Sequence, residues 1–293
     1  MNKVQKISSL RAAVGVARKD KKTVGFVPTM GNLHDGHLEL VRVAKRRADF
    51  VVVSIFVNPT QFGQNEDLAN YPSTPEEDAR MLAELGADVL FLPTKETMYP
   101  GDLEDQTVVY VPKIGDMYCG KDRPEHFYGV TTVVSRLFNM VQPDIAVFGN
   151  KDYQQITIIR RMVEDLAYPV QVVGVDTVRD EEGLALSSRN GYLIGLEHQL
   201  APHLQQTLQW LKQELMQFKA VKSKGFATSL EQEAKEQLEQ LGFKPQYINI
   251  CNQETLKPAK KGDQRLVILA AAYLGKTRLI DNIEVFLGDE AAS

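Results

Sequence analysis

Apolar residues form short continuous runs in the first part of the chain, and the clearest pattern spans residues 24–48. An apolar run at 24–27 breaks at Pro28, and apolar positions return after Gly36 with helical spacing. This pattern predicts a buried strand, a turn and a helix with one apolar and one basic side. The apolar side comprises Leu38, Val41, Val43 and Ala44, and the basic side comprises Arg42, Lys45, Arg46 and Arg47.

Further apolar runs alternate with helical patterns as far as residue 176. The run at 50–57 is nearly continuous, which is typical of a central parallel strand covered on both faces. Other strands are predicted at 88–93, 108–111, 144–148 and 170–175, and helices at 1–23, 75–86 and 127–141. The helix at 127–141 is apolar on all sides, so we expect it to be buried or to form a subunit contact. The alternation predicts right-handed βαβ units in a parallel sheet.

Beyond residue 193 the pattern changes to long polar-faced helices at 197–220 and 229–241 and strands at 246–251, 266–273 and 277–285. The predicted fold class is therefore α/β, with a Rossmann-like parallel sheet domain over 1–176 and a smaller C-terminal α+β domain over 177–293. We expect the second domain to act as a lid with a hinge near 175–190, and the tail at 288–293 to be loose.

Composition narrows the class of protein. The chain has 293 residues, 43% hydrophobic and 25% charged, as expected for an ordinary globular protein of two domains. No apolar run reaches the roughly 20 residues that cross a bilayer, and the start lacks a signal peptide, which predicts a cytoplasmic location without a membrane partner. Two cysteines are too few for a disulfide framework, and the net charge of −4 disfavours a nucleic-acid partner.

The turn between the first strand and helix contains two histidines, His34 and His37, separated by Asp35 and Gly36. A helix that begins near Gly36 directs its unpaired N–H groups and its positive end at the turn, so an anion is the expected ligand. The spacing matches neither a Walker loop nor a dinucleotide fingerprint. Imidazole groups can donate to phosphate oxygens and stabilise a transferring phosphoryl group. Two alternatives are a helix cap with a packed core histidine, and a zinc pair.

A second polar segment follows the next strand, at residues 58–62. Parallel strands bring their carboxyl ends to one edge of the sheet, so this segment and the histidine turn are expected at the same rim. Gln61 can both donate to and accept from a small hydroxy acid, although the segment also fits an ordinary loop. The polar residues 63–74 are a candidate lid over that rim.

Two later segments carry related chemistry. Residues 149–155 combine a glycine turn, a lysine and a helix start, which suits an anion or ribose site; an ordinary solvated helix start explains the same composition. Lys151 offers a point charge and Asp152 an acceptor for ribose or a metal shell. Ser187, Ser188 and Arg189 offer hydroxyl and guanidinium donors to a triphosphate, and they also fit a plain loop.

These segments together resemble a known family. His34-Asp35-Gly36-His37 resembles the H-x-G-H signature of the nucleotidylyltransferase superfamily, and the longer string at 28–37, PTMGNLHDGH, resembles the pantothenate synthetase (pantoate-beta-alanine ligase) family. The segment at 149–155 is similar to the family's G-E-K-D-x-x-Q, with Asn150 in place of the acid. Residues 187–189 are similar to the mobile KMSKS-like signature, with Leu186 where methionine is common.

The resemblance implies ATP-dependent condensation of (R)-pantoate with beta-alanine to pantothenate through a pantoyl adenylate, with release of AMP and pyrophosphate, Mg²⁺ with ATP, and a homodimer. It implies catalytic roles for His37, His34 and Lys151, and pantoate or beta-alanine contacts for Gln61 and Gln155. It implies ATP contacts for Met30, Gly31, Asn32, Leu33, His34, Asp35, Gly36, His37, Gly149, Asn150, Lys151, Asp152, Val178, Leu186, Ser187, Ser188 and Arg189. No residue is expected to form a protein-only metal site.

Departures from the family pattern leave alternatives open. Asp122 and Glu125 replace a small residue and a glycine in the charged loop at 118–126, next to Arg123, a candidate for phosphate or dimer contacts. One alternative is a nucleotidylyltransferase that acts on another small substrate. The other is a nucleotide-binding module that keeps the fold without catalysis.

Overall fold

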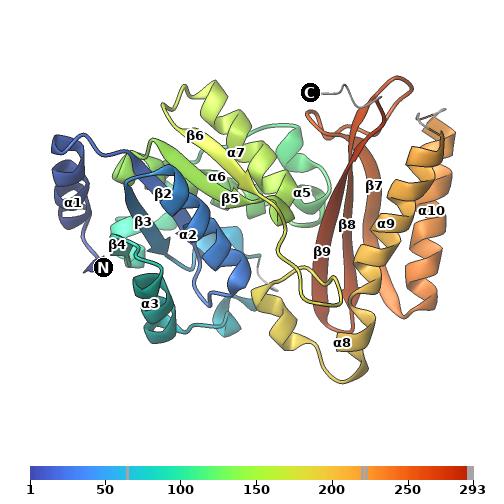
Figure 1. Ribbon diagram of the computed structural model, residues 1–293, viewed down its shortest axis with the longest axis horizontal. Helices are drawn as coiled ribbons and strands as arrows, with labels where there is room; N and C mark the ends of the chain where they lie inside the picture. Colours follow the sequence, from blue (N-terminus) through green and yellow to red (C-terminus); the bar gives the residue numbers. More distant parts are fainter. Residues whose placement is uncertain (64–65, 219–220, 222–223, 289–293) are drawn as a thin grey trace. The chain divides into compact units, whose positions relative to one another are not determined.

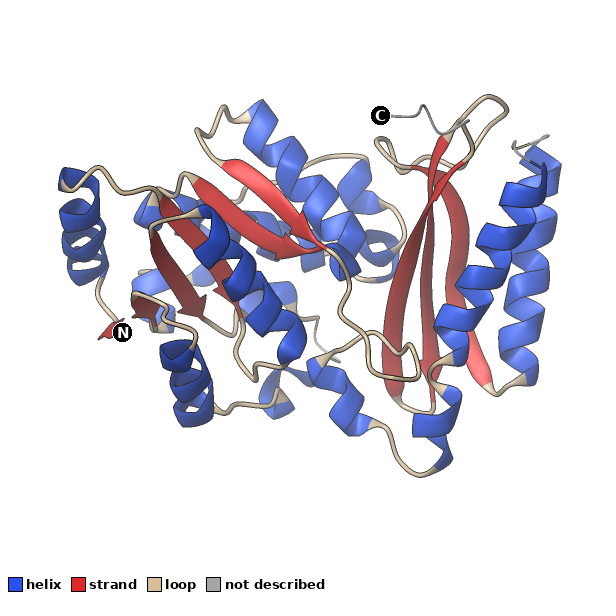
Figure 2. Ribbon diagram, in the orientation of Figure 1, coloured by secondary structure: helices blue, strands red, loops and turns tan. Residues whose placement is uncertain are grey.

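The computed structural model describes residues 1–63, 66–218, 221 and 224–288, and the chain divides into two compact units (Figure 1). Unit 1 comprises Met1–Asn150 and Gln154–Thr177, and unit 2 comprises Lys151–Tyr153 and Val178–Ser293. Part of the candidate lid at 63–74, the end of the helix predicted at 197–220 and most of the predicted tail fall outside the described residues. Each unit has its own sheet, which confirms the predicted fold class (Figure 2).

Unit 1 is built on a parallel sheet that, in the described residues, has six strands in the order β1-β4-β3-β2-β5-β6. β2 pairs with β3 along its whole length, from Val24 opposite Phe50 to Thr29 opposite Ile55. The segments that follow β2, β3 and β5 therefore leave from one edge of the sheet. The strands are β1 (Asn2–Val4), β2 (Val24–Thr29), β3 (Phe50–Ile55), β4 (Val89–Phe91), β5 (Ile145–Gly149) and β6 (Gln171–Val175).

Helices cover both faces of this sheet. On one face α2 buries Leu40, Val41 and Ala44, whereas Leu38 and Val43, predicted on the buried side, are only partly buried. On the other face Phe138 of α6 meets Phe26 and Phe148 edge-on, with ring centroids 6.4 Å apart in each pair. The helices are α1 (Ile7–Lys19), α2 (Asp35–Arg47), α3 (Pro75–Glu84), α4 (Lys95–Met98), α5 (Cys119–Asp122), α6 (His126–Val141) and α7 (Tyr153–Asp165).

Two predicted elements of unit 1 were wrong. Residues 1–23 form a short strand before α1, because Asn2 to Val4 pair with Val89 to Phe91 of β4, a contact that local periodicity does not reveal. Residues 108–111 do not form a strand. The backbone N–H of Val109 donates to Thr132 Oγ1 (3.0 Å), and the Val109 carbonyl accepts from the Thr131 hydroxyl, so α6 side chains replace a strand partner.

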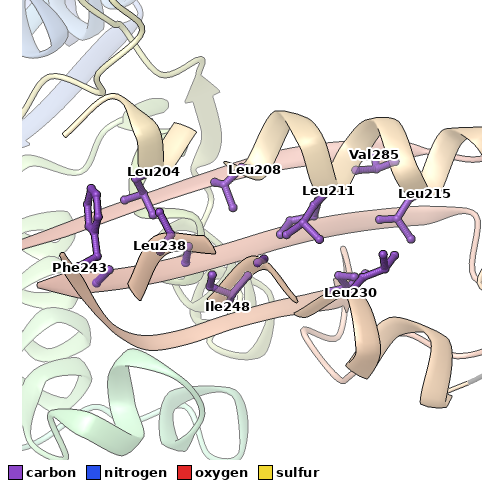
Figure 3. Packing of buried hydrophobic residues seen from close by; sticks show 14 of the residues in the cluster. Leu204, Leu208, Leu211, Leu215, Leu230, Leu238, Phe243, Ile248 and Val285 are labelled. Atoms are coloured by element: carbon purple, nitrogen blue, oxygen red, sulfur yellow. The ribbon is translucent and has the colours of Figure 1, made fainter. Parts of the chain in front are cut away.

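Unit 2 packs two long helices against an antiparallel sheet of β7 (Phe243–Asn252), β8 (Arg265–Leu274) and β9 (Thr277–Phe286). Leucines of α9 and α10 interlock with Ile248 and Val285 in its core (Figure 3). The helix predicted at 197–220 is interrupted next to Pro202, because proline has no N–H to continue the ladder. The helical segments are η6 (Ser188–Tyr192), α8 (Leu196–Leu200), α9 (His203–Phe218) and α10 (Lys224–Gln240).

Across the part of the chain that the structure describes, we find no helix with the length and apolar character needed to cross a membrane. Cys119 and Cys251 are both buried and unbonded to each other, as expected.

Candidate active site

The turn after β2 is held by a buried carboxylate. Asp78 of α3 is 1% exposed and accepts from the backbone N–H groups of Asn32 and Leu33, each at 2.9 Å. The turn has positive φ at Gly31 (82°) and Asn32 (50°), and a Cβ at Gly31 would lie 2.9 Å from Ile55 Cγ2. No sequence signal marks Asp78, because acids in a first helical turn are explained by the helix dipole alone.

The two histidines that follow cap α2 with their side chains. His34 Nδ1 accepts from the backbone N–H of Gly36 (3.1 Å), and His37 Nδ1 accepts from the backbone N–H of His34 (3.4 Å). The helix-cap part of that alternative is confirmed for both histidines, whereas the core-packing part is wrong, since both residues are only half-buried. Each bond requires an unprotonated Nδ1, so the neutral ring carries its proton on Nε2. The rings lie 4.1 Å apart between centroids and offer Nε2–H donors at a helix N-terminus.

Gln61 lies beside this turn, in the 3-10 helix η1 (Pro59–Gln61). Its side-chain Nε2 is 3.0 Å from Met30 Sδ, and its side-chain Oε1 accepts from Asn58 Nδ2 at 3.2 Å. The structure thus brings together Met30 and Gln61, which are 31 positions apart in the chain. The expectation that the ends of β2 and β3 share one rim is confirmed.

Residues of the charged loop hold the backbone of Gln61. Arg123 Nη2 (3.3 Å) and His126 Nδ1 (2.9 Å) both contact the Gln61 carbonyl oxygen. Arg123 also forms a bidentate pair with Glu66, at 2.6 Å and 2.5 Å. In unit 1, Arg123 therefore binds Glu66 and the backbone carbonyl of Gln61, a predicted substrate-binding residue.

The segment at 149–155 is divided between the units. Asn150, where the family has an acid, belongs to unit 1 and donates to Asp176 Oδ1 at 3.1 Å. Gln154 is buried and bonds the backbone of Ile114, Met117 and Cys119, which is a structural role. Its half-buried neighbour Gln155 lies in the first turn of α7 in unit 1.

The remaining predicted residues belong to unit 2. Lys151 Nζ lies 3.8 Å from Asp152 Oδ2, and the carbonyl of Lys151 accepts from Asn282 Nδ2 of β9 at 2.8 Å. The predicted triphosphate donors begin at Ser187, whose Oγ accepts from the Arg189 N–H at 3.2 Å and caps η6. Val178 and Leu186 pair through their backbones at 2.9 Å.

Adjacent residues of β9 anchor both parts of this set. Asp281 is 4% exposed and forms a bidentate pair with Arg179, at 2.6 Å and 2.8 Å. Asn282 holds the Lys151 backbone, as described above. The predicted donors of unit 2 therefore leave from loops that are fixed to one strand.

No group of three metal-ligating side chains occurs within the described ranges of the chain. What unit 1 offers is a set of N–H donors at the carboxyl edge of a parallel sheet, and unit 2 offers a lysine and a serine-arginine turn. An α/β fold with such donor groups at the carboxyl edge of its sheet is typical of enzymes that bind anions.

Comparisons with known proteins identify the family. A family model described as pantoate-beta-alanine ligase matches residues 2–284. Pantothenate synthetase of Pseudomonas putida is 52% identical over 292 residues, covering 100% of both chains, and that of Colwellia psychrerythraea is 51% identical over 287 residues, covering 98% of this chain and all of the relative. The chain belongs to the pantoate-beta-alanine ligase family and is a ligase.

Solved structures agree with this assignment. Pantothenate synthetase from Thermus thermophilus is 44% identical, covers 98% of this chain and 100% of its own, and superposes with a TM-score of 0.89. Pantoate-beta-alanine ligase from Francisella tularensis, solved in complex with beta-gamma ATP and beta-alanine, is 33% identical, covers 97% of each chain and has a TM-score of 0.77.

Proposed function

We propose that this chain condenses (R)-pantoate with beta-alanine to pantothenate, with ATP as the energy source and a pantoyl adenylate as the intermediate. The observation that carries this proposal is the histidine pair at the N-terminus of α2, whose Nε2–H donors suit a phosphate, beside the amide of Gln61, which suits a hydroxy acid. The nucleotide and the amine bound by the Francisella tularensis ligase support the same pair of co-substrates.

In the first step a carboxylate oxygen of pantoate attacks the α-phosphorus of ATP, and the bond to the bridging oxygen breaks to release pyrophosphate. His34 and His37 would donate hydrogen bonds to the phosphate oxygens through Nε2–H and, as neutral rings, would stabilise the developing charge without giving up a proton. Lys151, Ser187, Ser188 and Arg189 would hold the triphosphate. Positioning and stabilisation of charge supply most of the acceleration in such reactions.

In the second step the neutral amine of beta-alanine attacks the acyl carbon, the acyl-oxygen bond breaks, and AMP leaves. A proton leaves the nitrogen as the amide forms, so atoms and charge balance. Gln61 and Gln155 would hold pantoate during both steps. Backbone groups of Met30 to Gly36, Gly149 to Asp152, Val178 and Leu186 would line the nucleotide.

Mg²⁺ is proposed to arrive with ATP. This ion keeps several waters and is usually held by substrate phosphates and one or two carboxylates, which suits a chain whose described residues contain no larger ligand cluster. Asp152 is a candidate carboxylate, since its side chain is 46% exposed. The homodimer and the cytoplasmic location stay predictions.

The test of this function is AMP release by the purified protein with ATP, Mg²⁺ and pantoate, with and without beta-alanine. AMP that requires both substrates and matches pantothenate in amount supports the ligase. Release of an activated nucleotide as the final product supports a nucleotidylyltransferase with another substrate. ATP consumption that neither compound changes would reject the proposed substrates, and absence of pyrophosphate release would favour a silent nucleotide-binding module.

A further inference from the structure

A buried network fixes the side-chain amide of Asn58. Asn58 is 1% exposed and its Nδ2 donates to the carbonyl of Gly129 at 3.1 Å. Its Oδ1 accepts from the Tyr99 hydroxyl at 2.9 Å and from the Thr60 hydroxyl at 3.0 Å. Gly129 O can only accept, and the Thr60 N–H, which also meets Oδ1 at 3.4 Å, can only donate. The Asn58 amide therefore has a single permitted orientation.

The orientation of the Asn58 amide determines the orientation of the Gln61 side-chain amide. The second N–H of Asn58 Nδ2 points at Gln61, so Gln61 must present its acceptor Oε1 there. On the other side Gln61 Nε2 faces Met30 Sδ, a weak acceptor with no N–H or O–H of its own. Two independent neighbours thus leave the Gln61 Nε2 donors on the side of the histidine turn.

The buried hydroxyl of Tyr99 is the first donor in this hydrogen-bond network. The residue is 2% exposed and follows α4, with its ring 5.2 Å from the guanidinium of Arg136. Burial raises the pKa of its hydroxyl above the ordinary value, which keeps the group protonated and able to donate. A buried tyrosine hydroxyl needs a hydrogen-bond partner. Here the partner is the side-chain amide of Asn58, which orients Gln61, a predicted substrate-binding residue.

We propose that Tyr99 is a positioning residue for pantoate, acting through Asn58 to hold Gln61 with its N–H donors toward the substrate. Gln61 then recognises an acceptor oxygen of pantoate, a carboxylate or hydroxyl oxygen, through its Nε2–H donors. This inference rests on the proposed function, since it names how that site selects its acid.

The test uses Tyr99→Phe, which removes one hydroxyl and keeps the ring. We expect KM for pantoate to rise about three- to tenfold, with KM for ATP within twofold of wild type, as for the loss of one buried hydrogen bond. Tyr168→Phe is the matched control, because its hydroxyl bonds Ser135 (2.7 Å) and Asn139 (3.2 Å) of α6 and does not contact Asn58. The control should leave both KM values unchanged.

A double-mutant cycle separates positioning from general destabilisation. In a Gln61→Ala background, Tyr99→Phe should change kcat/KM for pantoate less than twofold, because the residue through which Tyr99 acts is gone. An effect of the same size in both backgrounds would overturn the proposal, as would an unchanged pantoate KM in Tyr99→Phe alone.

The orientation of the amide has its own test. Gln61→Glu keeps an acceptor for Asn58 and replaces the N–H donors by a carboxylate, so pantoate KM should rise at least tenfold. Wild-type pantoate affinity in this variant would overturn the assigned orientation. If the wild-type protein neither binds nor consumes pantoate, the proposed function is wrong and this inference is wrong with it. If the wild-type protein makes pantothenate but the variants behave as in the contradicting outcomes above, only this inference is wrong.

Discussion

At the scale of single residues, His34 and His37 have two roles that must be separated in any experiment. Their Nδ1 atoms cap α2, and their Nε2–H groups are the proposed phosphate donors. Loss of an N-terminal cap costs about 1 kcal/mol, whereas loss of a charge-stabilising donor costs about 10²-fold in turnover. Replacement by alanine removes both contributions at once.

We predict that His37→Gln separates them. A glutamine at this third helical position can accept from the His34 N–H, as in an ordinary capping box, but it supplies no imidazole. The variant should keep wild-type stability in urea while turnover falls about 10²-fold or more. His37→Ala should show the same fall in turnover and lose about 1 kcal/mol of stability. Near-normal turnover in His37→Gln would remove His37 from the mechanism.

The sequence was sufficient to predict the candidate residues that belong to a local motif, namely the histidine turn and the segments at 149–155 and 187–189. It did not reveal the residues that hold them. Asp78 lies 46 positions from Asn32, Tyr99 lies 41 from Asn58, and Asn282 lies 131 from Lys151. Such partners leave no spacing pattern, since only the folded chain brings them together.

At the scale of elements, α6 and η1 approach so closely that one helical position must be glycine. A Cβ at Gly129 would lie 2.3 Å from the Thr60 carbonyl oxygen and 2.6 Å from the Gln61 nitrogen, both backbone atoms. The apolar run at 127–141 predicted a helix that is buried or forms a dimer contact; α6 buries most of its surface within unit 1, and the dimer contact stays a prediction. The apolar pattern did not show that Gly129 allows η1 to pack closely against α6.

We predict opposite effects for two glycine substitutions in helices. Gly129→Ala should destabilise the protein by about 1–3 kcal/mol and raise pantoate KM, because η1 and Gln61 must move. Gly15→Ala in α1 meets no atom within 4 Å and should stabilise by about 0.5–1 kcal/mol without kinetic effect. Urea unfolding and pantoate kinetics measure both. Equal stability of the two variants would contradict the proposed close contact.

Another element contact predicts a dependence of stability on pH. Glu231 of α10 accepts from the backbone N–H of Ile250 in β7 at 2.7 Å, and burial raises its pKa above the ordinary value, opposed by Ile250, Lys235 and Asn249. The folded state thus binds the proton more tightly than the unfolded state. The contribution to stability is present below the unfolded pKa of about 4.5 and is lost as pH rises through the folded pKa.

We therefore expect Glu231→Gln, which keeps the acceptor and removes the charge, to unfold at a higher temperature than wild type at pH 7 to 8. The difference should shrink toward pH 4, where Glu231 is protonated in both states. Thermal unfolding between pH 4 and 8 measures this. Glu233→Gln on the exposed side of the same helix is the control, and a pH-independent difference for Glu231→Gln would argue against burial as the cause.

At the scale of the whole molecule, the alternation of strands and helices was enough to predict a parallel sheet followed by a smaller α+β part. The strand order and the short β1 were not predictable, because pairing between β1 and β4 is decided by contacts across 87 positions. The path of the chain between the units was also missed. Lys151–Tyr153 belongs to unit 2 although the residues on either side belong to unit 1.

The assignment of Lys151–Tyr153 to unit 2 affects when this segment can fold during synthesis. During synthesis Lys151 leaves the ribosome 131 residues before Asn282, the residue that holds its carbonyl. Unit 1 can bury its sheet while the lysine segment still lacks its strand, since domains generally fold as their residues emerge. Nascent chains that carry residues 1–177 followed by a linker long enough to span the exit tunnel should therefore protect β2 and β3 from proteases yet leave residues 150–154 open to cleavage. Lys151, a proposed nucleotide-binding residue, would therefore reach its folded position only when translation is nearly over.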